Sequence, residues 1–188
     1  NILRESYYDG RRAIRQVGTV IPPQYYRLGL VLGWSAKAVD VLARRCRLDG
    51  FVWPGGDIDD LGMRELYDAN QIGAEISAGI TSMFINGVSF LVTTRGGEGE
   101  PAALLHAKDG RNATGTWNAR RRGLDSLLSV TSWGDKGRVT GFVLYLPNLT
   151  ITAQQDSDGA WQVDRSAHLW GLPVEPLINS PGRSMRPL

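Results

Sequence analysis

Few residues of this 188-residue chain have the type and spacing that catalysis or metal binding requires. His106 and His168 are its two histidines, and no Gly-x-Ser-x-Gly motif accompanies them, so a serine-hydrolase triad is not indicated. Each is better interpreted as a surface or hydrogen-bonded histidine. Asp57, Asp59 and Asp60 could bind a divalent cation, but no further ligands follow at a suitable spacing, and carboxylates in the first turn of a helix explain them better. We therefore predict a protein that is not an enzyme, with no metal site and no cofactor.

Arg120, Arg121 and Arg122 form the strongest basic run of the chain. Three adjacent guanidinium groups on a loop can meet DNA phosphate or an acidic patch on a neighbouring subunit. A loop that is merely solvated is the alternative. Apart from Trp117, no aromatic residue lies close enough in the sequence to suggest base stacking. These arginines are the candidate contact residues for DNA or a subunit.

The bulk composition describes an ordinary globular protein, with 42% hydrophobic and 21% charged residues and a net charge of +2. No apolar run approaches the roughly 18 residues that a membrane span needs. Charge is uneven along the chain, because residues 1–52 carry nine Arg or Lys against four Asp or Glu, and residues 53–75 carry one against six. Blocks of opposite sign suit contacts between subunits, and solvated helix faces are the alternative.

The stretch 31–51 predicts a well-bounded amphipathic helix over residues 35–48. Ser35 is the expected N-cap, and Gly50 is the expected left-handed stop. Trp34 and Phe51 are expected to pack the two ends of the helix against the rest of the domain. The predicted last turn is basic and the predicted buried face is apolar, with Arg44, Arg45 and Arg47 in the former and Ala36, Val39, Leu42, Ala43 and Cys46 in the latter. The only cysteine is therefore predicted to be a packed thiol, and a disulfide framework is excluded.

Three further helices are expected in the first half of the chain. A short amphipathic segment should end at Asp9-Gly10, and Pro22-Pro23 should break the chain after it. Asp57 can cap a helix that runs to about Asn70. Apolar residues at helical spacing then predict a helix that ends at Asn86-Gly87, namely Ile72, Ile76, Ile80 and Met83.

After residue 87 the pattern changes to that of strands. Residues 88–94 read as a buried strand with which 102–107 could pair, and 108–123 read as a long polar loop. Turn signals about every ten residues then predict an antiparallel meander, and a last strand is expected near 173–178. The expected meander strands are 127–133, 139–146, 149–154 and 160–163.

These elements predict an α+β fold in which amphipathic N-terminal helices pack on a C-terminal antiparallel β-meander. We expect one domain over 1–188, with a mainly helical part at 1–87, a mainly β part at 88–179 and a tail at 180–188. The chain opens at Asn1 without a methionine, so its ends are expected to be cut.

Several blocks of sequence, in order, resemble the amino-terminal region of tailed-phage portal proteins, in particular the type found in phages of actinobacteria. The blocks are YYDG at 7–10, LGWSAKAVDVLARR at 32–45, LDGF at 48–51, DAN at 68–70, GVSFLV at 87–92, LYLPN at 144–148, PVEP at 173–176 and GRS at 182–184. The resemblance covers nearly the whole chain, and blocks in the same order are more specific than any single motif.

The resemblance implies a structural role in the virion. Portal subunits form a ring, usually of twelve, at one capsid vertex; the terminase pumps double-stranded DNA through it, and head-completion proteins dock on it. Besides other portal subunits, the implied partners are therefore capsid, terminase and head-completion proteins, with no membrane. The implied location is the portal vertex of the virion, and the host cytoplasm during assembly. The matched portion resembles the outer wing region.

The family runs more than twice as far, into stem, clip and crown regions that this sequence does not reach. Ring formation and terminase docking are therefore not implied for this chain alone. An expressed wing fragment, a prophage remnant and a short portal-like protein are the three explanations. The rival function is that of a truncated prophage-encoded protein that binds full-length portal subunits or interferes with their assembly.

Overall fold

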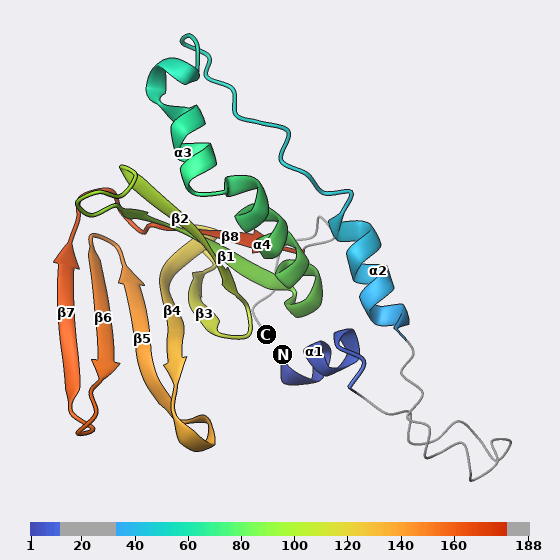
Figure 1. Cartoon of the computed structure of the whole chain (residues 1–188), viewed down its shortest axis with the longest axis vertical. Helices are drawn as coiled ribbons and strands as arrows, with labels where there is room; N and C mark the ends of the chain where they lie inside the picture. The colour runs from blue at the N-terminus through green and yellow to red at the C-terminus, as the bar shows by residue number, and fades with distance from the viewer. Residues whose placement is uncertain (12–32, 180–188) are drawn as a thin grey trace, which may run out of the picture.

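The computed structural model describes residues 1–11 and 33–179, and it places a helical layer beside two antiparallel sheets (Figure 1). The helices are α1 (Ile2–Tyr8), α2 (Trp34–Ala43), α3 (Met63–Ala69) and α4 (Ile72–Asn86), with short 3₁₀ turns η2 (Asp59–Leu61) and η3 (Asp135–Gly137). The strands are β1 (Val88–Arg95), β2 (Ala103–Asp109), β3 (Ala113–Asn118), β4 (Gly123–Trp133), β5 (Val139–Leu146), β6 (Leu149–Gln155), β7 (Trp161–Ala167) and β8 (Val174–Ile178). The predicted α+β class is confirmed.

The strands form two sheets rather than one. The smaller sheet has the order β2-β1-β8, and the larger one has the order β3-β4-β5-β6-β7. The four predicted meander strands are β4 to β7, and β3 is an additional strand at the edge. Every pair is antiparallel, and β1 pairs with β8 through contacts such as Val88 with Ile178. The last predicted strand is therefore present, and it joins the small sheet instead of extending the meander.

The hydrophobic core lies between the two sheets. Leu127 of β4 is fully buried at 0% exposure, and Phe90 and Val92 of β1 are 3% and 1% exposed. Further buried members come from both sheets, namely Ala113, Tyr145 and Val174. Burial of these side chains removes the largest contiguous apolar area from water and is the main stabilising contribution to the fold.

The helices cover the other face of the small sheet. Side chains alternate along a strand, so Phe90 points into the core while Ser89 points toward α4. The Ser89 hydroxyl donates a hydrogen bond of 2.6 Å to the carbonyl of Gly79, in the middle of α4. A Cβ at Gly79 would lie 3.1 Å from Leu177 Cδ1, so the absent side chain permits the close approach of helix and sheet.

The expectation that the helices pack on the meander is therefore wrong in detail. α4 makes its sheet contacts with β1, β2 and β8, which form a layer between the helices and the meander. The sequence of the β8 strand gives no sign of this arrangement, because its partner β1 lies about ninety residues earlier in the chain.

Several predicted elements are confirmed. α1 ends at Asp9-Gly10, where Gly10 takes a φ of 67°. α4 ends at Asn86 with Gly87 in the left-handed region at a φ of 88°, as the Asn-Gly pair predicts. The predicted turn at Pro22-Pro23 and the tail at 180–188 lie outside the described residues.

The predicted helix 35–48 is shorter than expected. α2 begins at Trp34 with Gly33 as its N-cap, and no side chain caps it, so the prediction of Ser35 as the cap is wrong. The helix ends at Ala43 with Arg44 in the right-handed helical region, seven residues before the predicted stop at Gly50. Consecutive hydrogen bonds of the 3₁₀ type at Arg45 and Cys46 tighten this end without a left-handed residue.

The predicted packing of this stretch is also wrong. Trp34 is 71% exposed and Phe51 is 40% exposed, so neither ring clamps the helix onto the domain. Cys46 is exposed rather than packed, because the helix ends before the turn that would bury it. No residue of α2 is buried. Of the predicted apolar face, Ala36, Val39 and Ala43 are half-buried, whereas Leu42 and Cys46 are exposed.

Two predictions on the loops need correction. Residues 108–123 are not one loop, because they contain β3, which the sequence hides behind small and polar residues such as Gly115. The Asp57 carboxylate accepts a 3.0 Å bond from the amide of Asp59, so it caps the turn η2 and not a long helix. Gly62, with a φ of 69°, separates η2 from α3.

Tyr145 should make the free energy of unfolding depend on pH. Burial raises the pKa of its hydroxyl above the usual 10.0, because the ionised form is poorly solvated in the core. The contribution of the neutral hydroxyl to stability is therefore complete below pH 10 and is lost as the pH rises through the folded-state pKa. Tyr145→Phe should cost about 1 kcal/mol or less at pH 7 and should lower the loss of stability above pH 10. Urea unfolding at pH 7 and at pH 11 measures both, and an unchanged pH slope would contradict the assignment.

Candidate interaction surface

The three candidate arginines lie together on the turn between β3 and β4, and all three side chains are exposed. Asn118, the last residue of β3, shapes the turn, because its side-chain oxygen accepts bonds of 3.1 and 3.0 Å from the amides of Arg120 and Arg121. Arg122 adopts a φ of 53°, which reverses the chain into β4. Two strands of the meander thus hold the basic run at their end.

The three guanidinium groups are not equivalent. Arg121 forms an ion pair with Asp125, four residues later. Within residues 1–11 and 33–179, no ion pair or hydrogen bond occupies the side chain of Arg120 or Arg122. Two unpaired, exposed cations on a tight turn can bind phosphate or carboxylate groups of a partner.

The other candidate residues are dispersed. His106 is exposed on β2, and His168 follows β7, so the histidines do not meet each other or the aspartates near η2. Asp59 forms an ion pair with Arg64, and that carboxylate raises the pKa of the guanidinium through a hydrogen bond and its charge. Among the described residues, no three His, Cys, Asp or Glu side chains lie close enough to hold a metal ion.

His168 is more enclosed than the sequence indicates. Its side chain stacks on Trp170 with ring centroids 4.9 Å apart, and its Nε2 lies 3.3 Å from the hydroxyl of Thr150. The residue is 7% exposed, and its Nδ1 has no hydrogen-bond partner in the part of the chain that the structure describes. Histidine here packs the connection between the meander and β8, so of the two predicted roles it takes the hydrogen-bonded one.

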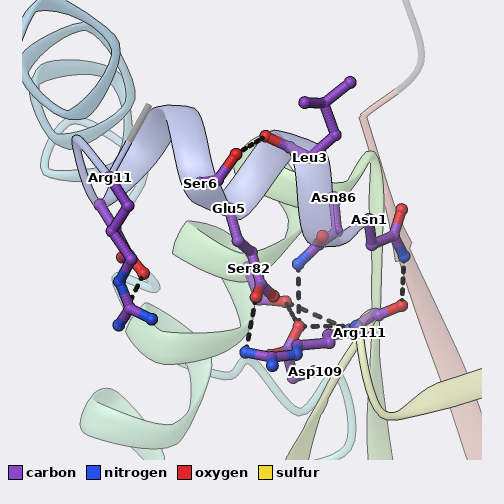
Figure 2. Close-up of polar contacts among 11 residues, drawn as sticks. Asn1, Leu3, Glu5, Ser6, Arg11, Ser82, Asn86, Asp109 and Arg111 are labelled. Carbon is purple, nitrogen blue, oxygen red and sulfur yellow. Dashed lines mark hydrogen bonds and ion pairs between the residues drawn. The ribbon is translucent and has the colours of Figure 1, made fainter. Parts of the chain in front are cut away.

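Figure 2 shows a polar cluster that fixes α1 on the body of the protein. The side-chain amide of Asn1 donates a 2.5 Å hydrogen bond to the carbonyl of Gly110, and Arg111 forms a 2.8 Å ion pair with Glu5. Both partners on the body lie in the turn that follows β2. The sequence did not indicate this cluster, because its members are up to 109 residues apart.

Asp109 is the centre of that cluster. One oxygen of its carboxylate accepts hydrogen bonds from the Ser82 hydroxyl at 2.7 Å, the Asn86 side-chain amide at 2.9 Å and the Arg111 backbone amide at 2.9 Å (Figure 2). Arg4 of α1 in turn donates to the carbonyl of Asn86 at 2.5 Å. This carboxylate oxygen thus joins α4, the end of β2 and the turn that follows it.

An exposed apolar segment is the main feature that the sequence did not predict. We call residues 44–57 the arm; it leaves the C-terminal end of α2 and runs alongside the molecule to the far end of α3 (Figure 1). Phe51, Val52 and Trp53 follow one another in the arm and are 40%, 91% and 51% exposed. Contiguous exposed apolar side chains of this size mark a contact surface.

No helix in the described part of the chain is both long and apolar enough to cross a membrane. The surfaces described above offer two kinds of contact, cationic at the turn between β3 and β4 and apolar in the arm.

Comparison with known proteins places the chain in a family. The sequence model of the family described as "Phage portal protein, SPP1 Gp6-like" matches residues 2–181. The chain is 23% identical over 186 residues to the portal protein of Mycobacterium phage L5, which covers 95% of this chain and 38% of that protein. It is 28% identical over 90 residues to the portal protein of Mycobacterium phage D29, which covers 48% of this chain and 19% of that protein.

The chain thus spans well under half the length of these portal proteins. The family match, in contrast, includes all the helices and strands described above. The resemblance carried by the ordered sequence blocks is confirmed, and this chain belongs to the SPP1 Gp6-like family of phage portal proteins.

Proposed function

We propose that this chain is the wing region of a portal subunit, acting in the ring at the capsid vertex through which DNA is packaged and ejected. The observation that carries the proposal is the family match over residues 2–181, with portal proteins of two mycobacteriophages among the relatives. In this proposal the chain is one domain over 1–188, with its helical part at 1–87, its β part at 88–179 and its tail at 180–188. Its location is the portal vertex and, during assembly, the host cytoplasm.

The proposed role is structural rather than catalytic. It is supported by the use of Asp109 as a structural acceptor and by the dispersed positions of the histidines and aspartates. The proposed partners are other portal subunits, with capsid, terminase and head-completion proteins meeting the whole subunit. The exposed arm and the Arg120–Arg122 turn provide contact surfaces for such partners.

Co-expression with the intact portal protein of the same phage tests the proposal. The intact protein carries an affinity tag, and the purified particles are weighed by native mass spectrometry and viewed by electron microscopy. A wing region that can occupy a subunit position gives mixed rings that contain the chain. Arrested assembly, with the intact protein held below ring size, supports the rival function of an interfering portal-like protein. Absence of any complex contradicts both.

Arg120 and Arg122 are proposed to contact DNA phosphate. Reversal of both charges, in R120E/R122E, should lower the affinity of the chain for a DNA duplex by about tenfold or more and reduce the slope of log K against log salt by about 2. Fluorescence anisotropy over a salt series measures both quantities. Arg121 is left unchanged because its ion pair with Asp125 holds the turn.

A matched control variant is K136E/R138E, which makes the same change of charge at the exposed turn between β4 and β5. If both variants lose affinity equally, the binding follows net charge and not this site. If neither changes it, DNA is not the partner of the arginine turn, and a neighbouring subunit becomes its proposed partner.

A further inference from the structure

The arm offers apolar side chains that the described part of the chain leaves uncovered. All residues of 44–57 are exposed except Leu48, and the central run Phe51-Val52-Trp53 belongs to no helix or strand. The described part of the chain does not bury these large apolar side chains, and their exposure to water is unfavourable in free energy. The composition of the arm therefore fits a segment that is covered by another surface.

A basic patch lies at the start of the arm. Arg44, Arg45 and Arg47 are exposed, and no ion pair within residues 1–11 and 33–179 engages them. Arg44 and Arg47 line a hollow of about 420 Å³ between α2 and α4, which Tyr8 and Asp40 also line. Asp40 is already occupied there, because its carboxylate accepts a 2.8 Å hydrogen bond from the Tyr8 hydroxyl. The two guanidinium groups are thus available to an incoming carboxylate.

An acidic patch lies at the other end of the arm. It comprises four exposed carboxylates on η2, α3 and the residues just before them, and none of the ion pairs among the described residues uses them. They are Asp57, Asp60, Glu65 and Asp68. In Figure 1 the arm separates this end from the C-terminal end of α2, so the two patches of one molecule do not neutralise each other.

We propose that the basic patch of one copy of this chain binds the acidic patch of the next, and that the apolar centre of the arm is buried in this contact. The inference rests on the proposed function, since a ring of identical subunits requires two different, complementary surfaces on each subunit. Opposite charge at the two ends of one exposed segment supplies that complementarity. Like charges would oppose each other if two basic ends or two acidic ends met.

A second copy is the occupant that this charge pattern favours. DNA would bind the basic patch and be repelled by the acidic one, and it would leave Val52 and Trp53 exposed. A surface of the same chain carries both charges and the apolar residues in the required order. Two copies of the chain can therefore form this contact without a third partner.

Charge exchange between two variants provides the test. R45E/R47E makes the basic patch acidic, and D60K/E65K makes the acidic patch basic. Each variant alone should associate at least about tenfold more weakly than the unmodified chain in sedimentation velocity at low salt, because like charges then face each other. An equimolar mixture should recover the association, since both kinds of contact between the two variants again join opposite charges.

The control is again K136E/R138E, which should associate like the unmodified chain. Circular dichroism of each variant checks its fold, and recovery in the mixture shows directly that both variants are folded. The expected species grow beyond a dimer, as head-to-tail contacts require. The proposal is overturned if the unmodified chain stays monomeric at every concentration, or if its association stops at a dimer. It is also overturned if the mixture of the two variants does not recover the association.

Cys46 gives an independent measurement, because it is the only cysteine and is exposed beside the basic patch. The unmodified chain is mixed with a size-tagged C46A/D60C variant and treated with a short bismaleimide reagent. The proposal predicts a covalent product that joins one chain of each size. Products that contain only two unmodified chains place basic end against basic end and contradict it.

The outcomes also separate this contact from the proposed function. If mixed rings with the intact portal protein form while charge reversal leaves them unchanged, the wing function stands and the arm contact is wrong. If association through the two patches is found but mixed rings never form, the arm contact stands and the portal-ring role of this chain is wrong.

Discussion

Leu127→Ala is expected to lower the free energy of unfolding by about 3–5 kcal/mol. Leu127 is 0% exposed, in the centre of the core between the two sheets. Removal of three carbons there loses the transfer free energy of the side chain and leaves a cavity. The surrounding strands cannot close that cavity, because each is hydrogen-bonded to its neighbours on the ladder.

Chemical denaturation measures this loss, and thermal unfolding should show it at roughly 2–4 °C per kcal/mol. Leu169→Ala is the matched control, since the same atoms are removed from a side chain that is 96% exposed. The control should change the free energy of unfolding by less than about 0.5 kcal/mol. Equal effects of the two substitutions would show that the core does not lie between the sheets.

Gly110→Ala is expected to lower the free energy of unfolding by about 2–3 kcal/mol, although it adds a single methyl group. A Cβ at this position would lie far inside the contact distance of the Val88 carbonyl oxygen, and 3.1 Å from the Cβ of Asn86. The first obstacle is backbone, so no change of rotamer relieves it. The start of β1 must move, and the bonds from Asn1 and to Ser82 at this turn are strained with it.

Gly33→Ala is the control for this substitution. Gly33 has a φ of −72°, which alanine adopts without strain, and nothing lies within 4 Å of a Cβ built there. Restriction of the unfolded chain favours Gly33→Ala, whereas the poorer preference of alanine for an N-cap position opposes it. The free energy of unfolding of this control should therefore change by less than about 1 kcal/mol. Both variants are measured by the same urea titration. If Gly110→Ala loses no more free energy of unfolding than Gly33→Ala, the backbone of the turn after β2 can move away from the added methyl group.

The sequence predicts those elements whose signals are local. α4 is bounded by an apolar stripe and an Asn-Gly stop, and both signals depend only on neighbouring residues. The hairpins of the meander follow from turn residues at short spacing in the same way. These elements were predicted to within a few residues because no distant contact decides them.

Predictions that depended on tertiary contacts fared worse. Trp34 and Phe51 are large and apolar, so burial in the same chain was the natural expectation, yet both are exposed. Apolar periodicity indicates that a surface will be covered and does not say by which molecule. The division into two sheets was missed for a related reason, because β8 has to pair with β1 across the whole meander.

The candidate surface was predicted in part. The Arg120–Arg122 run is visible in the sequence and is exposed on one turn, as a basic loop should be. Of these arginines, Arg121 is neutralised by its ion pair with Asp125, on a turn whose geometry Asn118 sets. No periodicity of the sequence reveals this pairing. The opposite charge of residues 1–52 and 53–75 is also visible in the sequence. Only the structure places its exposed members at the two ends of one arm.

The pairing of β1 with β8 has a consequence for synthesis on the ribosome. Val88 and Ile178 are paired in the small sheet, so ninety residues must be made after Val88 before its partner in β8 exists. The hairpins of the meander need only a few dozen residues each and can close while the chain is still emerging. The nascent protein therefore acquires its meander before its central strand is flanked on both sides, and the sheet that carries the helices is the last to be completed.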